Sequence, residues 1–234
     1  MSVNDPAAVR DQYATESNLQ ARQRLWEDAE GPDPKQILWQ TLAAWEPQRV
    51  LEVGGGQGEL AERIANELQA SVTFLDLSPR MVELARERGL DAREGDVQEL
   101  PFADESFDTV VAAWMLYHVP DIARGLSEIA RVLVPGGALI AVTTSADHVA
   151  ELRALLNYDI GLARTFTREN GEEQLRRHFA TVERYDADVR VSVSDRLKLV
   201  DYQQSISTKT APVPDDVELP FIVRGLTSIF FATK

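Results

Sequence analysis

The sequence predicts an α/β protein with a Rossmann-like, doubly wound fold and a mostly parallel sheet. Between residues 49 and 144, short β-rich runs alternate with amphipathic helical stretches, which is the pattern of crossover units in a parallel sheet. The first β-rich run leads through a glycine cluster directly into a helix. With 234 residues, the chain has the length of one large domain.

Five runs in this region are expected to be strands, and they cover residues 49–53, 71–76, 91–94, 107–113 and 138–144. A helix is expected after the first run, because Leu60, Ile64 and Leu68 recur every four residues and mark one helix face. The next helix carries its own boundary signals. Ser78 suits its N-cap, and Gly89 suits its C-terminal end.

A third helix is expected over residues 121–133, and the Pro-Gly-Gly sequence at 135–137 ends it. After residue 144 the alternation loosens. Residues 147–158 indicate a helical insertion after the fifth strand. Asn170 and Glu173 have the spacing of a capping box at the start of another helix.

The C-terminal part completes the predicted sheet. Residues 181–193 are β-like, and residues 194–206 are helical in pattern. The last run, 226–233, is apolar and β-branched, so we expect it to close the sheet as an antiparallel C-terminal edge strand.

Composition narrows the possible classes of function. The sequence contains no cysteine, which excludes disulfides, thiolate metal sites and cysteine nucleophiles. A net charge of −14 without a basic stripe disfavours nucleic-acid partners. The acid pairs at 104–105 and 215–216 lack histidine partners, so we expect no metal site.

The chain carries no predicted membrane or export signal. Its longest nearly apolar run, residues 110–119, has about half the length that a membrane-spanning helix needs. The first residues lack a basic region followed by an apolar core, so they do not read as a secretory signal. We therefore expect a cytoplasmic protein that does not associate with membranes.

The glycine cluster follows an acid and has an unusual spacing. Glu52, Gly54, Gly56 and Gly58 occupy every second position. A dinucleotide fingerprint starting at Gly54 needs glycine where Glu59 stands. An acid so close to the loop repels a pyrophosphate but pairs with an ammonium group. The pattern favours a ligand that bears an amino-acid end.

Two further acids end the second and third predicted strands. Asp76 is suited to accept hydrogen bonds from a ribose diol, or else to act as a helix N-terminal acid near Ser78. Asp96 is suited to accept from an exocyclic amine, or else to cap a turn. Open α/β sheets bind ligands at the carboxyl ends of their strands, where these acids are expected.

These motifs resemble the class I S-adenosylmethionine-dependent methyltransferases, in particular the group similar to ubiquinone- and menaquinone-biosynthesis enzymes. The matching segments are LEVGGGQG, FLDLSPRMVELAR, REGDVQELPFADESFDTVVAAWMLYHVPD and EIARVLVPGGALI, in order over about residues 49–144. The resemblance implies S-adenosylmethionine as cofactor. It divides the single domain into a helical lid or packing segment (1–45), a cofactor-binding core (46–145) and an acceptor-side insertion that completes the sheet (146–234).

The resemblance also implies site residues. The methionine part is assigned to Glu52 and the loop glycines Gly54, Gly55, Gly56 and Gly58. The ribose is assigned to Asp76, and the adenine to Leu77, Met81, Asp96 and Val97. A narrower likeness to an N-terminal helix of some relatives involves Tyr13 and Arg22. Ala113 and Trp114 are expected to line the methyl-transfer face, where such relatives often carry polar residues.

The methyl acceptor is expected to be a small molecule. Its pocket is expected between the N-terminal segment and residues 147–206, with Tyr117, His148, Phe166 and Tyr202 as candidate contacts. His118 follows the fourth predicted strand, and it is either a general base or a structural residue. Three alternatives stay open: a cofactor-binding protein without activity, an RNA methyltransferase, and a nicotinamide-dependent oxidoreductase.

Overall fold

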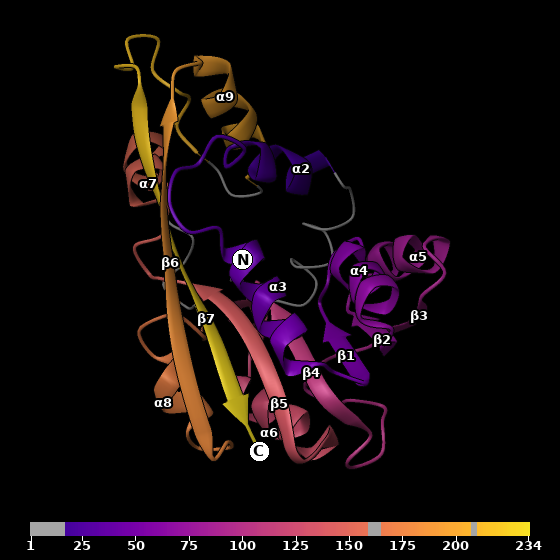
Figure 1. Ribbon diagram of the computed structural model, residues 1–234. Coiled ribbons are helices and arrows are strands. Elements are labelled where there is room, and N and C mark those ends of the chain that lie inside the picture. The colour runs from indigo at the N-terminus through magenta and orange to yellow at the C-terminus, as the bar shows by residue number, and fades with distance from the viewer. Residues whose placement is uncertain (1–16, 159–164, 207–209) are drawn as a thin grey trace.

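The computed structural model describes residues 17–158, 165–206 and 210–234. A seven-stranded sheet in the order β3-β2-β1-β4-β5-β7-β6 runs through the protein (Figure 1). Its strands are β1 (Arg49–Val53), β2 (Ser71–Asp76), β3 (Asp91–Glu94), β4 (Phe107–Ala113), β5 (Leu133–Thr144), β6 (Thr181–Val193) and β7 (Phe221–Thr233). The pairs among β1 to β5 are all parallel, so the predicted α/β class is confirmed.

The helices of the described residues follow the predicted alternation. They are α2 (Ser17–Arg24), α3 (Pro34–Trp45), α4 (Glu59–Leu68), α5 (Pro79–Glu87), α6 (Ile122–Val132), α7 (Ala150–Leu156), α8 (Gly171–Leu175) and α9 (Arg196–Gln204), with a short 3-10 helix η1 (Leu116–His118). Asp121 caps α6 by accepting from the N–H of Arg124 at 3.1 Å.

Successive residues of each strand face two different helical layers. Val50 packs in a cluster with Leu42 of α3, whereas the next residue, Leu51, packs with Ile129 of α6. Side chains alternate between the two faces of a strand, so strands this short and this apolar need helices on both sides. This is the doubly wound arrangement that the sequence predicts.

The C-terminal strand is antiparallel, as predicted, but it does not form the edge. β7 lies between β5 and β6 and is antiparallel to both, and β6 is the outermost strand. The middle of β7 is buried on both faces, including Ser228, Ile229 and Phe230, whereas most of β6 is exposed. An inner strand of a covered sheet is apolar along its middle, so the apolar run fits a position inside the sheet as well as at its edge.

One local prediction is confirmed and one needs correction. Ser78 is the N-cap of α5, as predicted. Asn170 stands at the N-cap of α8, but without a side-chain capping bond, because its Oδ1 accepts from the N–H of Thr167 at 2.8 Å instead. The predicted capping box is therefore absent, although the helix forms.

Phe166 belongs to the hydrophobic core, so its expected role as an acceptor contact is wrong. Its side chain is fully buried, and its ring centroid lies 5.8 Å from that of Phe230. Leu175 and Phe179 belong to the same cluster. The residue packs the segment after α7 onto the sheet.

Phe166→Ala should lower the free energy of unfolding by about 3–5 kcal/mol, the usual cost of truncating a buried phenylalanine. Tyr185→Ala on the exposed strand β6 is the control and should cost less than about 1 kcal/mol. Urea unfolding measures both. A loss below 1 kcal/mol for Phe166→Ala would contradict the core assignment.

Candidate active site

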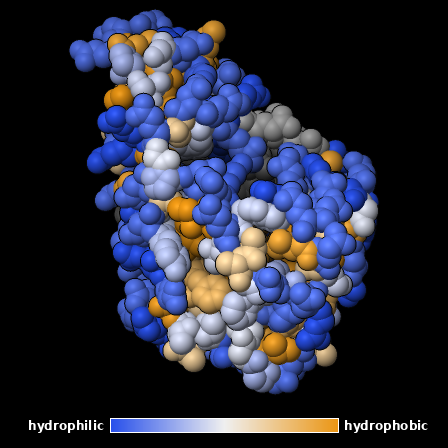
Figure 2. Space-filling view, viewed as in Figure 1, coloured by the Kyte–Doolittle hydropathy of each residue, from blue (hydrophilic) through white to orange (hydrophobic). Residues whose placement is uncertain are grey.

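A large cavity opens at the carboxyl ends of β1, β2 and β4, and its volume is about 1210 Å³. Figure 2 shows a mostly hydrophilic face that is hollowed between the part built by α2 and α9 and the part built by α4 and α5. Ligand sites usually measure about 300–1,000 Å³. The cavity is therefore large enough for two small molecules side by side.

The glycine loop forms one wall of this cavity. Gly54 and Gly56 line it and have φ angles of 64° and 59°, in the region that favours glycine. Gly58 has a φ of 76° but lies outside the lining. A Cβ on Gly58 would lie 3.1 Å from Cβ of Ala85 and 3.0 Å from Leu90, so this glycine permits α4 to approach α5.

Glu52 lies directly beneath the loop. A Cβ on Gly55 would fall 2.4 Å from the Glu52 carboxyl carbon, so a side chain at this position would displace the carboxylate. Glu52 is 1% exposed, and its Oε2 has no hydrogen-bond partner among the described residues. Burial raises the pKa of Glu52 to about 8, and the charge of Asp76 adds to the rise. A cation beside this carboxylate would relieve both effects.

Asp76 lines the same cavity at the end of β2. Its Oδ1 accepts from the N–H of Ser78 at 2.8 Å. Asp76 thus has the structural role at the start of α5 that the sequence also allowed. Burial raises the pKa of Asp76 to about 6, although hydrogen bonds from the backbone of Ser78, Gly56 and Leu77 oppose the rise. The carboxylate is thus oriented by the backbone while it faces the cavity.

Asp96 follows β3, and like Asp76 it has both a local structural role and a place in the cavity wall. Its Oδ1 accepts from the backbone N–H of Gln98 at 2.8 Å, so it caps a turn, and it lines the cavity together with Val97. Leu77, which precedes α5, and Met81, within α5, also line the cavity. These residues supply apolar surface and an acceptor, as the resemblance implies for an adenine.

The end of β4 and the residues after it extend the cavity wall beside the loop. Ala113 and Trp114 line the cavity, and Trp114 has a φ of 55°, which is uncommon for a bulky residue. Its N–H donates to the carbonyl oxygen of Val142 at 2.8 Å. Met115 approaches so closely that a Cβ on Gly54 would lie 2.8 Å from its Cβ.

The acceptor-side predictions have mixed outcomes. Tyr117, His118, His148 and Tyr202 all line the cavity, and so does Arg22 of α2. Tyr13 lies outside the described residues.

The sequence reasoning missed Trp26 and Tyr158, which also line the cavity. Aromatic residues in helical stretches are more often core than ligand contacts, so no sequence signal marked them.

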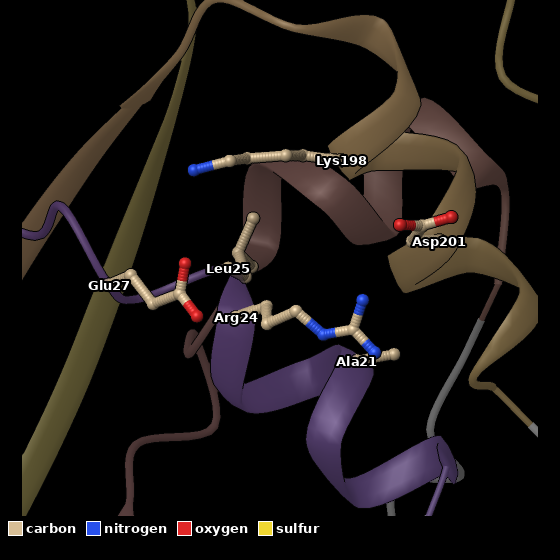
Figure 3. Close-up of a pocket in the computed structure, with 6 residues that line it drawn as sticks. All are labelled: Ala21, Arg24, Leu25, Glu27, Lys198 and Asp201. Carbon is tan, nitrogen blue, oxygen red and sulfur yellow. The ribbon is translucent and has the colours of Figure 1, made fainter.

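The N-terminal segment docks beside the cavity. A small hollow of about 210 Å³ lies between α2 and α9, and Figure 3 shows the charged side chains of both signs that line it. Lys198 of α9 forms an ion pair with Asp28 at 2.9 Å. α3 packs on the sheet through Leu38 and Leu42. The segment thus contributes a packing helix, α3, and a shorter helix at the cavity rim, α2.

No group of three or more His, Asp or Glu side chains in the part of the chain that the structure describes is arranged to hold a metal ion. No helix in the described ranges is long and apolar enough to cross a membrane.

Known proteins match this fold and this loop. A family model described as a methyltransferase domain matches residues 51–141. The ubiquinone/menaquinone biosynthesis C-methyltransferase UbiE of Brucella suis biovar 1 is 36% identical over 132 residues, which are 52% of this chain and 47% of that protein. UbiE of Bartonella bacilliformis is 33% identical over a similar share. The chain spans about half the length of these relatives.

Solved structures agree over more of the chain. The [4+2]-cyclase SpnF is 23% identical with a TM-score of 0.63, covering 97% of this chain and 94% of that one. A putative methyltransferase from Bacillus halodurans is 22% identical with a TM-score of 0.61, covering 86% and 98%. At this level of identity the likeness concerns the fold.

The fold is shared with solved structures of the methyltransferase type, and residues 51–141 match the methyltransferase-domain family. The resemblance identified from the sequence motifs is confirmed.

Glu52→Gln should change how stability depends on pH. The folded-state pKa of about 8 exceeds the ordinary value of 4.5, so the folded state binds the proton more tightly than the unfolded state. Wild-type stability should therefore fall as pH rises from 4.5 toward 8, and level off above 8. The difference between wild type and Glu52→Gln should grow by up to about 1.4 kcal/mol per pH unit within this window.

Urea unfolding of both proteins at several pH values measures this difference. Glu59→Gln changes an exposed acid in the same region and serves as the control, which should follow the wild type. Parallel pH profiles for Glu52→Gln and wild type would contradict the raised pKa.

Proposed function

We propose that this protein transfers a methyl group from S-adenosylmethionine to a small-molecule acceptor. The observation that carries the proposal is the buried carboxylate of Glu52, whose Oε2 has no hydrogen-bond partner among the described residues. It lies beneath Gly55, in the cavity that Asp76 also lines. An α-ammonium group there would compensate a buried negative charge, which explains an acid at a ligand-binding loop.

The lining residues fit this cofactor part by part. Glu52 would bind the ammonium group, and the glycines Gly54, Gly55 and Gly56 let the main chain approach the methionine part. Asp76 would accept from the ribose diol, and Asp96 would accept from the adenine amine while Met81 and Val97 pack on the ring. When bound, S-adenosylmethionine supplies an electrophilic methyl group on a sulfonium.

The protein's own contribution is then mainly positioning. The cavity walls would hold cofactor and acceptor next to each other, and correct alignment is worth about 7–11 kcal/mol of the barrier to a displacement reaction. A base is needed only where the acceptor arrives protonated, as a hydroxyl does. His118 and His148 are the histidines that line the cavity.

The alternatives have weaker support. A nicotinamide dinucleotide places a pyrophosphate at the loop, where Glu52 would repel it. The net charge of −14 disfavours RNA as the acceptor. The neighbour SpnF is named a cyclase, and one fold hosts several chemistries, so a cofactor-binding protein without methyl transfer is the second candidate. Turnover of S-adenosylmethionine with a panel of acceptors tests between them.

The domain division follows from the same proposal. Residues 46–145 would bind the cofactor, residues 146–234 would form the acceptor side and complete the sheet, and residues 1–45 would serve as a lid or a packing segment. The cytoplasmic location expected from the sequence stays a prediction, as does the small-molecule nature of the acceptor.

Asp76→Ala should weaken binding of S-adenosylhomocysteine at least tenfold, because hydrogen bonds to a charged acceptor contribute about 1.5–3 kcal/mol each. Asp76→Asn retains an oxygen for the Ser78 N–H but offers a donor in place of the second oxygen, so it should lose a similar amount. Isothermal titration calorimetry measures both. Asp91→Ala is the control, because Asp91 stands at the start of β3, away from the carboxyl ends of the strands. Affinity of Asp76→Ala within twofold of wild type would refute the ribose assignment.

His118→Ala should lower the melting temperature and reduce turnover and cofactor affinity only modestly. His118 ends η1, and its N–H donates to the carbonyl oxygen of Met115 at 2.9 Å. Its ring lies 4.6 Å from that of Tyr117, centroid to centroid, and the nearby acid Asp121 caps α6 through Oδ1. A thermal melt and single-turnover rates on the same variant decide. A rate loss of roughly 10²–10⁴ with unchanged melting would instead identify a general base.

A further inference from the structure

The side chain of Gln98 joins the acid that follows β3 to the start of α6, and no role assigned above uses it. Its Nε2 donates to both carboxylate oxygens of Asp96, at 3.1 Å to Oδ1 and 2.9 Å to Oδ2. Its Oε1 accepts from the backbone N–H of Asp121 at 3.0 Å. Gln98 and Asp96 both line the cavity. One amide thus bridges an acid of the cavity wall and the N-cap of α6.

The partners of Gln98 determine which way round its amide lies. A backbone N–H is always a donor, so the group that faces Asp121 must be the amide oxygen. An ionised carboxylate only accepts, so the group that faces Asp96 must be the amide nitrogen. The opposite orientation would set oxygen against oxygen at one end and N–H against N–H at the other. The Gln98 amide is therefore fixed with its nitrogen on Asp96.

Gln98 also restricts the rotation of the Asp96 carboxylate. The terminal torsion of an aspartate is broad by itself, but Oδ1 of Asp96 accepts from the backbone N–H of Gln98 at 2.8 Å in addition to the amide. Among the described residues, Gln98 is the source of every hydrogen bond to this carboxylate. A carboxylate oxygen has two acceptor positions. Oδ1 uses both, whereas Oδ2 uses one and keeps one for a ligand.

The segments that Gln98 joins are packed against the same helix. Asp121 is the N-cap of α6, and its side chain accepts from the first turn. A Cβ on Gly125 of α6 would lie 3.3 Å from Cγ1 of Val119 and 3.6 Å from Cγ1 of Val97. Both valines belong to the buried core. The bridge therefore rests on a tightly packed support, which a positioning role requires.

We propose that Gln98 is a positioning residue that makes the cofactor site selective for a base with an amino group. By holding the Asp96 carboxylate in one orientation, it keeps an acceptor in place for an exocyclic amine. A base with an oxygen at that position brings an acceptor to an acceptor, and no hydrogen bond forms. This inference rests on the proposed function, because it takes Asp96 to bind the base of S-adenosylmethionine.

The test compares S-adenosylhomocysteine with S-inosylhomocysteine, in which an oxygen replaces the 6-amino group, by isothermal titration calorimetry. Wild type should bind the first at least about tenfold more tightly, because one hydrogen bond to a charged acceptor is lost with the second.

Gln98→Met keeps the length of the side chain but removes the amide. It should weaken binding of S-adenosylhomocysteine at least about fivefold and leave that of S-inosylhomocysteine within about twofold, so the ratio of the two affinities falls. Gln69→Met is the matched control. It changes an exposed glutamine whose Nε2 donates to the carbonyl oxygen of Asn66, and it should leave both affinities unchanged.

A purely structural role of Gln98 would lower both affinities in parallel and leave their ratio unchanged. That result overturns the inference, as does equal affinity of wild type for the two ligands. If a thermal melt shows that Gln98→Met does not fold, Gln98→Asn takes its place, because an amide one methylene shorter cannot span both partners. It should lower the same ratio.

The wild type separates the two proposals. Its failure to bind S-adenosylhomocysteine refutes the proposed function. Normal binding by wild type, combined with a ratio that does not respond to residue 98, refutes only the role of Gln98.

Discussion

The buried carboxylate of Glu52 is the constraint on which the rest of the site depends. It stands at the end of β1 with 1% exposure, directly below a glycine whose Cβ would collide with it. Burial raises its pKa to about 8, and that of the neighbouring Asp76 to about 6. Two acids in one wall are costly without a cation, so the loop, the strand ends and the cavity are best explained by a ligand that brings positive charge to this position.

The two walls of the cavity are assembled from the chain in different ways. The parallel strands β1, β2 and β3 deliver acids and glycines to one edge of the sheet, because parallel strands all end on the same side. The other half is assembled from distant parts of the chain: Trp26 after α2, His148 after β5 and Tyr202 in α9. The ion pair of Lys198 with Asp28 joins the N-terminal segment to α9. One wall is thus acidic and the other aromatic, which suits two chemically different molecules.

The division also explains what the comparisons cover. The matched family segment, residues 51–141, contains Glu52, Asp76 and Asp96 but ends before His148, Tyr158 and Tyr202. The matched segment therefore carries the wall that we assign to the cofactor. The wall that we assign to the acceptor lies outside that segment, in the N-terminal part and after β5.

The amino-acid sequence by itself determined the alternation of strands and helices, the glycine loop and the acids at the strand ends, because period, turn chemistry and spacing are local properties. It did not determine that β7 lies one position inside the edge, that Phe166 packs on Phe230, or that Trp26 and Tyr158 reach the cavity. Nor did it determine the hydrogen bond that the backbone N–H of Leu226 donates to Nδ1 of His148. These features join residues far apart in the chain, and such pairings are decided only when the sheet and its helices pack together.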